Sequence, residues 1–392
     1  MDVFVADWLN LILRWAHMVV GIGWIGTSFY FIALDLGLRK EKTAPAGVYG
    51  DQWQVHGGGF YHVRKFTVAP PQLPEHLVWF RWEAYLTWAT GFGLLIVQYY
   101  WNARAYLIDP TVMDLTPVAA ISISVATLVA GWLIYDLICR SPIGERPVLL
   151  STVVFVLIVA ASWGLSLVFS GRGAFIHVGS LIGTIMAANV FLVIIPNQKK
   201  MVAQLIAGQD PDPKYGAIGK QRSVHNNYLT LPVLLMMVSN HYPMLYSHPY
   251  SWLVVALIIV VGGLVRHLIN RHEAGEDFNA YSWAAPVAAI ALASAITVTA
   301  PRSATSSVQV ADADVLEIVN HHCTVCHARK PKHPGFAEAP KDMRLETIRD
   351  IRQYARLIRV QAVQSNAMPL GNETRMTGEE REKLGAWLGA QK

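Results

Sequence analysis

His322-Cys323-Thr324-Val325-Cys326-His327 is the stretch from which the organisation of this 392-residue chain follows. Two cysteines separated by two residues and followed directly by histidine form the attachment signature of a c-type haem. Each thiol adds to one vinyl group of the porphyrin, and the histidine lies on the same helical turn, where it gives the iron its proximal ligand. The motif therefore predicts one covalent haem c, bound through Cys323, Cys326 and His327.

A second iron ligand is expected farther along the chain. Met368, in Asn366-Ala367-Met368-Pro369-Leu370-Gly371-Asn372, is well placed, and a His/Met pair raises the haem potential. The alternative is that the two cysteines form half of a structural zinc site. The third cysteine, Cys139, lies in an apolar run, so cysteines alone cannot complete such a site. Haem c is attached outside the cytoplasm, so the motif also predicts the side of a membrane on which the C-terminus lies.

The composition is that of a membrane protein. Hydrophobic residues make up 53% of the chain and charged residues only 15%, whereas soluble proteins carry about 25% charged residues. A span needs about 20 apolar residues, and the segments that reach this length are 8–37, 77–101, 115–138, 148–170, 173–195, 224–243, 250–269 and 280–300. We predict an all-α fold: a bundle of eight transmembrane helices at 1–300, a linker at 301–310 and a small helical cytochrome c domain at 311–392.

The basic residues predict the orientation of these spans. Fourteen Lys and Arg residues fall in the loops after the first, third, fifth and seventh segments or, for Arg266, in the last turn before such a loop, and the alternate loops hold only Arg104 and Arg172. Positively charged loops stay in the cytoplasm. We therefore expect a multi-pass protein of the bacterial inner membrane, with the N-terminus and the C-terminal domain in the periplasm. The haem motif requires the same location for the C-terminus.

The C-terminal domain is predicted to contain three helices. The first covers 311–327 and ends in the haem motif, and the second covers 345–364. The third begins at the capping box Thr377-Gly378-Glu379-Glu380. Its apolar residues Leu384 and Trp387 are expected to pack on the first helix.

Histidines within the spans need an explanation, because buried polar groups in a membrane are expensive and often functional. On the predicted topology, the outer half of the bilayer holds His17, His177 and His241, and the inner half holds His76, His225 and His267. Membrane cytochromes hold haem b between histidines of different helices. The outer three are therefore candidate iron ligands of a haem b. The alternative for each histidine is a hydrogen-bonding role inside the bundle.

A small-molecule site is expected on the cytoplasmic side, where the sixth span begins with His225-Asn226-Asn227-Tyr228-Leu229-Thr230. Asn226 and Thr230, at i and i+4, share one helix face, and His225 and Tyr228 share a neighbouring face. The loop Val55-His56-Gly57-Gly58-Gly59-Phe60-Tyr61 lies on the same side, and its glycines would let the backbone approach a ligand closely.

Arg81 and Glu83, near the inner end of the second span, would complete this site. Each of these signals has a simpler explanation. A glycine triplet usually forms a flexible turn, and an arginine near the end of a span, such as Arg81, usually extends its charge to the membrane interface. Asp136, a further polar residue near an inner helix end, is expected to be solvated.

Four motifs together resemble one family. They are Val55-His56-Gly57-Gly58-Gly59-Phe60-Tyr61, His225-Asn226-Asn227-Tyr228, Ser239-Asn240-His241-Tyr242-Pro243 and Cys323-Thr324-Val325-Cys326-His327. The chain is similar over essentially its whole length to the bacterial membrane-bound, cytochrome c-linked urate oxidases, also called the urate hydroxylase PuuD family.

The resemblance implies oxidation of urate to 5-hydroxyisourate, with electrons passed to haem c and the respiratory chain and no hydrogen peroxide formed. The implied partners are urate, a soluble cytochrome c or terminal oxidase, and the lipid bilayer, with no nucleic acid. Urate is a planar anion, which an arginine can pair with. The predicted binding residues are Arg81 and three polar residues at the start of the sixth span, Asn226, Tyr228 and Thr230. The predicted catalytic residues, which would include the base, are His56, Glu83 and His225.

Two other functions fit parts of the sequence. The membrane domain could transfer electrons only, as part of a cytochrome b/c protein that acts as a quinol or other dehydrogenase. The chain could also be a non-enzymatic transporter or membrane anchor that presents cytochrome c to an oxidase. The anchor explains the C-terminal domain but not the many polar groups within the spans.

Overall fold

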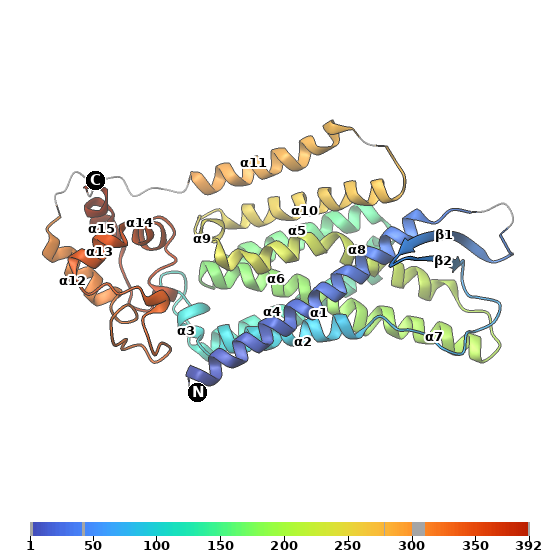
Figure 1. Cartoon of the computed structure of the whole chain (residues 1–392), viewed down its shortest axis with the longest axis horizontal. Coiled ribbons are helices and arrows are strands. Elements are labelled where there is room, and N and C mark those ends of the chain that lie inside the picture. The colour runs from blue at the N-terminus through green and yellow to red at the C-terminus, as the bar shows by residue number, and fades with distance from the viewer. Residues whose placement is uncertain (1–2, 41–43, 278, 300–309, 391–392) are drawn as a thin grey trace.

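The computed structural model describes residues 3–40, 44–277, 279–299 and 310–390. These residues form a helix bundle and a smaller C-terminal domain, which lies at one end of the bundle beside helix α3 (Ala103–Tyr106) (Figure 1). A β-hairpin lies at the opposite end of the bundle (Figure 1). The predicted linker, 301–310, lies outside the described residues except for Val310.

Six helices in the described part of the chain are long and apolar enough to cross a membrane. They are α1 (Val3–Gly37), α4 (Pro117–Arg140), α5 (Pro147–Ser166), the continuous helix α6, η3 and α7 (Gly171–Ala188, Asn189–Ile194, Ile195–Ile206), α10 (Ser251–Glu273) and α11 (Ala284–Val298), which follows η5 (Ala280–Trp283). These helices are compatible with a multi-pass membrane protein.

The other two predicted spans are helical but do not reach the same apolar length. Helix α2 (Trp82–Leu95) has only 14 residues before it continues as the π-helix η1 (Ile96–Tyr100). The predicted sixth span lies in α8 (Pro213–Val238), whose first half carries several charged residues. The structure therefore supports six of the eight predicted spans by length and composition.

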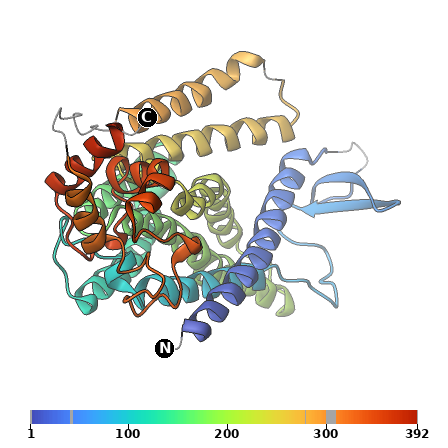
Figure 2. The ribbon, with the colours of Figure 1, turned by 60° about the vertical axis from the view of Figure 1, so that its left-hand side comes forward.

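Helix α6 and its continuation form the centre of the bundle. In the apolar window of this helix 61% of the residues are buried, against 6% in α1 and in α11. Helices α4, α5 and α8 pack on α6. Helices α1 and α11 lie at the periphery (Figure 2), where their exposed apolar side chains would face lipid.

The segment after α1 is a β-hairpin, which corrects the all-α expectation for this part of the chain. Strand β1 (Val48–His56) pairs antiparallel with β2 (Gly59–Phe66). The turn between them consists of Gly57 and Gly58, with φ angles of 58° and 82°. A two-residue hairpin turn needs positive φ, which glycine adopts without strain. The glycine run therefore builds a turn, as the simpler explanation of that sequence held.

The C-terminal domain contains the predicted helices. They are α12 (Asp312–His322), a helical run of α13 (Ile348–Gln353), α14 (Ala355–Ile358) and η7 (Arg359–Gln364), and α15 (Gly378–Ala390). As predicted, Leu384 and Trp387 share one apolar core with residues of α12. The indole N–H of Trp387 also donates to Asp312 Oδ1 at 2.7 Å. The capping box is present, because the Thr377 amide donates to Glu380 Oε2 at 2.7 Å.

Short helices complete the described chain. In the bundle they are η2 (Pro142–Glu145), η4 (Ser239–His241) and α9 (Pro243–Tyr246); in the C-terminal domain they are η6 (Pro340–Asp342) and η8 (Leu370–Asn372).

The C-terminal domain contacts the bundle through η8. Gly371, with a φ of 59°, lies against the carbonyl groups of Arg104 and Ala105 in α3. Nearby, Arg375 forms an ion pair with Asp114 at 3.1 Å. The turn that follows Met368 is therefore the part of the C-terminal domain that lies on the bundle.

Candidate functional site

The Cys-X-X-Cys-His motif continues the last turn of α12. The amide of Cys323 donates to the Val319 carbonyl at 2.8 Å, and the amide of His327 donates to the Cys323 carbonyl at 2.8 Å. Both thiols, of Cys323 and Cys326, are free and partly exposed. These hydrogen bonds bring the two thiols and the imidazole into one compact turn, which attachment of a single porphyrin requires.

The His327 ring is held in the form that binds iron. Its Nδ1 lies 2.8 Å from the carbonyl oxygen of Met343, and a carbonyl can only accept. Nδ1 therefore carries the hydrogen, and Nε2 keeps its lone pair for a metal. Burial lowers the pKa of His327, which favours the neutral ring.

Met368 packs against the same small core as Cys323. Its amide donates to the Gln361 carbonyl at 2.8 Å, and its own carbonyl accepts from Arg381 at 2.7 Å. The backbone of the predicted sixth ligand is thus anchored on both sides. The zinc alternative lacks ligands: in the described chain, no cluster of three or more metal-ligating side chains includes either cysteine of the motif. The donor set therefore fits haem c.

A second group of polar side chains lies inside the bundle, where α4, η3 and α8 meet. We call it the inner polar centre, and it consists of Tyr135, Asp136, Asn189, Arg222, His225 and Asn226. Arg222 donates to Asp136 Oδ1 at 2.7 Å, and its guanidinium lies over the Tyr135 ring at 5.0 Å. Only 1% of Arg222 is exposed. Asp136 also accepts from Arg140 at 2.7 Å. This buried ion pair corrects the expectation that Asp136 is solvated.

The remaining members form a hydrogen-bonded chain. Tyr135 Oη lies 2.7 Å from His225 Nδ1. The amide nitrogen of Asn189 donates to Tyr135 Oη and to Asn226 Oδ1, both at 3.0 Å. Asn189 is the first residue of the π-helix η3, and π-helical turns are frequent at functional sites. His225 is the partly exposed member of the centre; the other five residues are buried.

Three buried polar atoms of the centre have no hydrogen-bond partner among the described residues. They are Nε and Nη1 of Arg222 and Oδ1 of Asn189. An unpaired buried polar group costs about 1–3 kcal/mol, and more when it is charged. Two donors on a guanidinium and one amide acceptor are therefore available to a polar ligand.

Four of the predicted site residues lie along α8, and the structure separates them. His225 and Asn226 belong to the inner polar centre, and Thr230 donates to the Asn226 carbonyl at 2.7 Å. Tyr228 instead lies 2.9 Å from His267 of α10. The neighbouring Asn227 accepts a hydrogen bond from Arg266, also of α10. The predicted face shared by His225 and Tyr228 therefore contacts two different helices.

The other three predicted residues of this site lie elsewhere. His56 is exposed at the end of β1, next to the hairpin turn. Arg81 precedes α2 and stacks on Trp82, with 5.6 Å between the guanidinium and the ring centre. Glu83 lies in the first turn of α2, and a Cβ at Gly23 of α1 would be 3.7 Å from its Cγ. Among the described residues, no hydrogen bond joins any of the three to His225.

The three candidate ligands of haem b occupy different surroundings. His17 Nδ1 lies 3.0 Å from the Thr87 carbonyl and joins α1 to α2. His177 is fully buried, with Nδ1 at 2.7 Å from the Gly173 carbonyl and Nε2 at 2.5 Å from Ser124 Oγ. His241 is exposed. Both nitrogens of His177 have hydrogen-bond partners, so neither is free to bind iron in this arrangement. The structure favours the hydrogen-bonding alternative for His177, whereas the contacts of His17 involve Nδ1 and leave its Nε2 open.

Sequence reasoning missed Arg222, Tyr135 and Asn189. Arg222 carried a usable signal, because it precedes His225 by three residues on the same helix and lies on nearly the same face. Its position between the predicted spans 173–195 and 224–243 instead indicates a cation of a cytoplasmic loop. Asn189 carries the signal of a polar amide inside the predicted span 173–195, whereas Tyr135 carries no local signal.

Residues 3–299 match the family model described as Urate oxidase N-terminal. No curated protein and no solved structure matches the chain. The matched region covers the whole bundle, including the inner polar centre, and it indicates an oxidoreductase that acts on urate.

Proposed function

Since the chain belongs to the urate oxidase N-terminal family, we propose that it oxidises urate to 5-hydroxyisourate and passes the electrons to a haem c in its own C-terminal domain. A soluble cytochrome c or a terminal oxidase then accepts them, so that no hydrogen peroxide forms. The protein would lie in the bacterial inner membrane, with both termini in the periplasm.

The observation that carries the proposal is the unused hydrogen-bonding capacity of the inner polar centre. Urate is a planar anion with carbonyl oxygens that accept and ring N–H groups that donate. The free Nε and Nη1 of Arg222 can donate to a urate oxygen, and the free Oδ1 of Asn189 can accept from a ring N–H. A guanidinium suits this planar pairing better than an ammonium group does.

His225 is the residue that we propose as the base. The reaction converts the urate monoanion and one water into 5-hydroxyisourate, one proton and two electrons. When Nδ1 of His225 donates to Tyr135 Oη, 2.7 Å away, Nε2 is free to take the proton. Tyr135 would thereby orient the ring, while Asn226 would hold Asn189 in place.

Haem c, held by Cys323, Cys326 and His327 with Met368 as sixth ligand, would supply a one-electron acceptor. The two electrons of urate must therefore leave one at a time. From His225 to Asn240, near the far end of the sixth predicted span, the chain runs 15 residues, or roughly 22 Å of helix. The C-terminal domain lies at the end of the bundle opposite the hairpin (Figure 1). Substrate and acceptor would thus face opposite sides of the membrane.

The test is anaerobic mixing of the purified protein with urate, with haem c reduction followed by its visible absorption. Arg222→Gln removes the two free donors but leaves Asp136 paired with Arg140. A hydrogen bond to a charged group contributes about 1.5–3 kcal/mol. At low urate, we therefore expect haem c reduction to slow by about 10- to 150-fold. Arg222→Lys, which keeps the charge but not the planar donors, should recover only part of this loss.

Arg266→Gln is the matched control. Arg266, a residue of α10, is as buried as Arg222 but donates to Asn227 of α8, outside the inner polar centre. Equal losses in both glutamine variants would indicate a folding role for any buried arginine. A parental rate in Arg222→Gln would reject the inner polar centre, and Arg172 and His177, toward the C-terminal domain, would be tested next. Reduction by quinol but not by urate would favour the dehydrogenase alternative, and reduction by neither would favour the anchor.

A further inference from the structure

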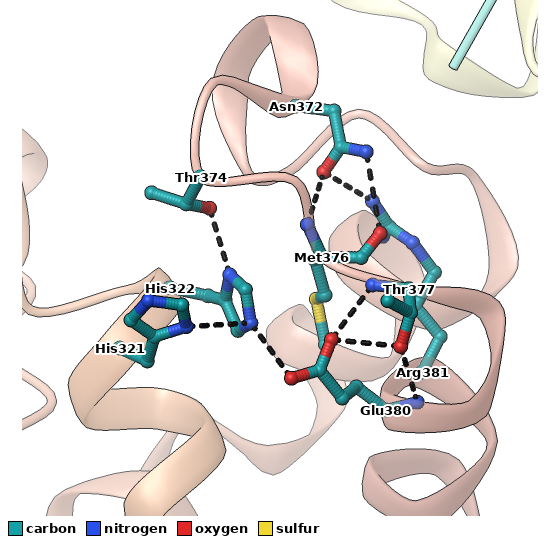
Figure 3. Close-up of polar contacts among 8 residues, drawn as sticks. All are labelled: His321, His322, Asn372, Thr374, Met376, Thr377, Glu380 and Arg381. Atoms are coloured by element: carbon teal, nitrogen blue, oxygen red, sulfur yellow. Dashed lines mark hydrogen bonds and ion pairs between the residues drawn. The ribbon is translucent and has the colours of Figure 1, made fainter. Parts of the chain in front are cut away.

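Two adjacent histidines at the end of α12 meet the first turn of α15 (Figure 3). His321 Nδ1 lies 3.1 Å from His322 Nε2, and His322 Nε2 lies 3.1 Å from Glu380 Oε1. These three atoms all lie within 4.8 Å of one another. No step of the proposed reaction uses them.

The second polar atom of each of the two inner residues, His322 and Glu380, has its own hydrogen-bond partner, which fixes the orientation of both side chains. His322 Nδ1 lies 2.9 Å from Thr374 Oγ1. Glu380 Oε2 accepts from the amide of Thr377 at 2.7 Å and from its hydroxyl at 2.8 Å. Only 1% of the His322 side chain is exposed. Figure 3 shows His322 Nε2 between His321 Nδ1 and Glu380 Oε1, in contact with both atoms.

We propose that His321, His322 and Glu380 bind a divalent transition metal, foremost Zn²⁺. Two imidazoles and one carboxylate form a common ligand set for zinc, which leaves a fourth position for water. Zinc lies 2.0–2.2 Å from such ligands, so neighbouring ligand atoms of a tetrahedral site are about 3.3 Å apart. Two of the three separations are 3.1 Å, close to that value, and the third, between His321 Nδ1 and Glu380 Oε1, is within 4.8 Å.

The surroundings supply what such a site needs. A ligating histidine usually donates its other ring N–H to a nearby oxygen, as His322 can donate to Thr374. His321 is exposed, so the ion and its water can enter from solvent. The metal would join the end of α12, one residue before Cys323, to the start of α15. It would act as a structural clamp on the helix that carries the haem-binding turn.

The site can be tested on the untagged, full-length holoprotein after treatment with a chelator. Zn²⁺ alone is titrated by calorimetry, and Co²⁺ serves as a second probe because its visible absorption reports tetrahedral coordination. We expect one saturable site per chain in the parent protein. His321→Ala and Glu380→Gln should each weaken Zn²⁺ binding by at least tenfold. His321 is exposed, so its variant should fold normally, and the haem c spectrum checks that it does.

His333→Ala is the matched control. His333 Nε2 lies 3.0 Å from Glu373 in the same domain. Among the described residues, this pair does not belong to a group of three or more possible metal ligands. Binding that survives in the control and is lost in the two site variants supports the clamp. The proposal fails if Zn²⁺ does not saturate at one per chain, if the site variants bind like the parent, or if all three variants lose binding equally. None of these outcomes depends on urate.

Discussion

Gly371 is the position at which one methyl group should separate the C-terminal domain from the bundle. It has a φ of 59°, and a Cβ there would overlap the carbonyl oxygen of Arg104 and lie 2.8 Å from that of Ala105. These neighbours are backbone atoms of α3 and cannot rotate away as a side chain could. Gly371→Ala must therefore shift the turn or lift it off α3.

The backbone conformation of Gly371 gives a lower limit for the free-energy cost of the Gly371→Ala substitution. An L-residue in the left-handed region costs roughly 1–2 kcal/mol, which corresponds to a factor of about 5–30 in an equilibrium constant. The overlap with α3 adds to this value. We expect the equilibrium constant for docking to fall by at least about fivefold, and the rate of haem c reduction by urate to fall with the docked population.

The assay is stopped-flow reduction of haem c by urate under anaerobic conditions. Gly378→Ala is the control, because no atom lies within 4 Å of a Cβ at that position in the same domain. The haem c spectrum should be unchanged in both variants, since Met368 lies three residues before the altered turn. A parental reduction rate in Gly371→Ala would refute the role of the contact with α3. A changed spectrum would show that the strain had moved to the ligand loop instead.

Four further outcomes follow. Cys323→Ala with Cys326→Ala should abolish covalent haem, and haem that still resists acidic extraction would contradict the attachment. Met368→Ala should keep the haem attached but make it high-spin with a lower potential; an unchanged spectrum would point to another sixth ligand. His225→Gln should slow urate-driven reduction at saturating urate, whereas His267→Gln should not, because His267 contacts α8 outside the inner polar centre. A reporter enzyme fused to the C-terminus should be active only in a periplasmic form, and cytoplasmic activity would overturn both the orientation and the haem assignment.

Features set by near neighbours in the chain could be predicted from the sequence. The capping box at Thr377 and the helix before Cys323 depend on hydrogen bonds that span a few residues, and the structure shows both. The apolar length of six spans depends only on composition along the chain. The prediction of haem c is equally local, because it depends on the spacing of two thiols and a histidine, which the structure places in one turn.

The inner polar centre required the tertiary structure. Asp136 and Arg222 are 86 residues apart in the chain, and each has an ordinary explanation as a charge near a helix end. Their burial follows from the packing of α8 on α6 and η3. Likewise, His225 and Tyr228 have similar local sequence signals, but they contact α4 and α10 respectively. Periodicity predicts which side chains share a helix face, whereas only the packing of helices decides what each face meets.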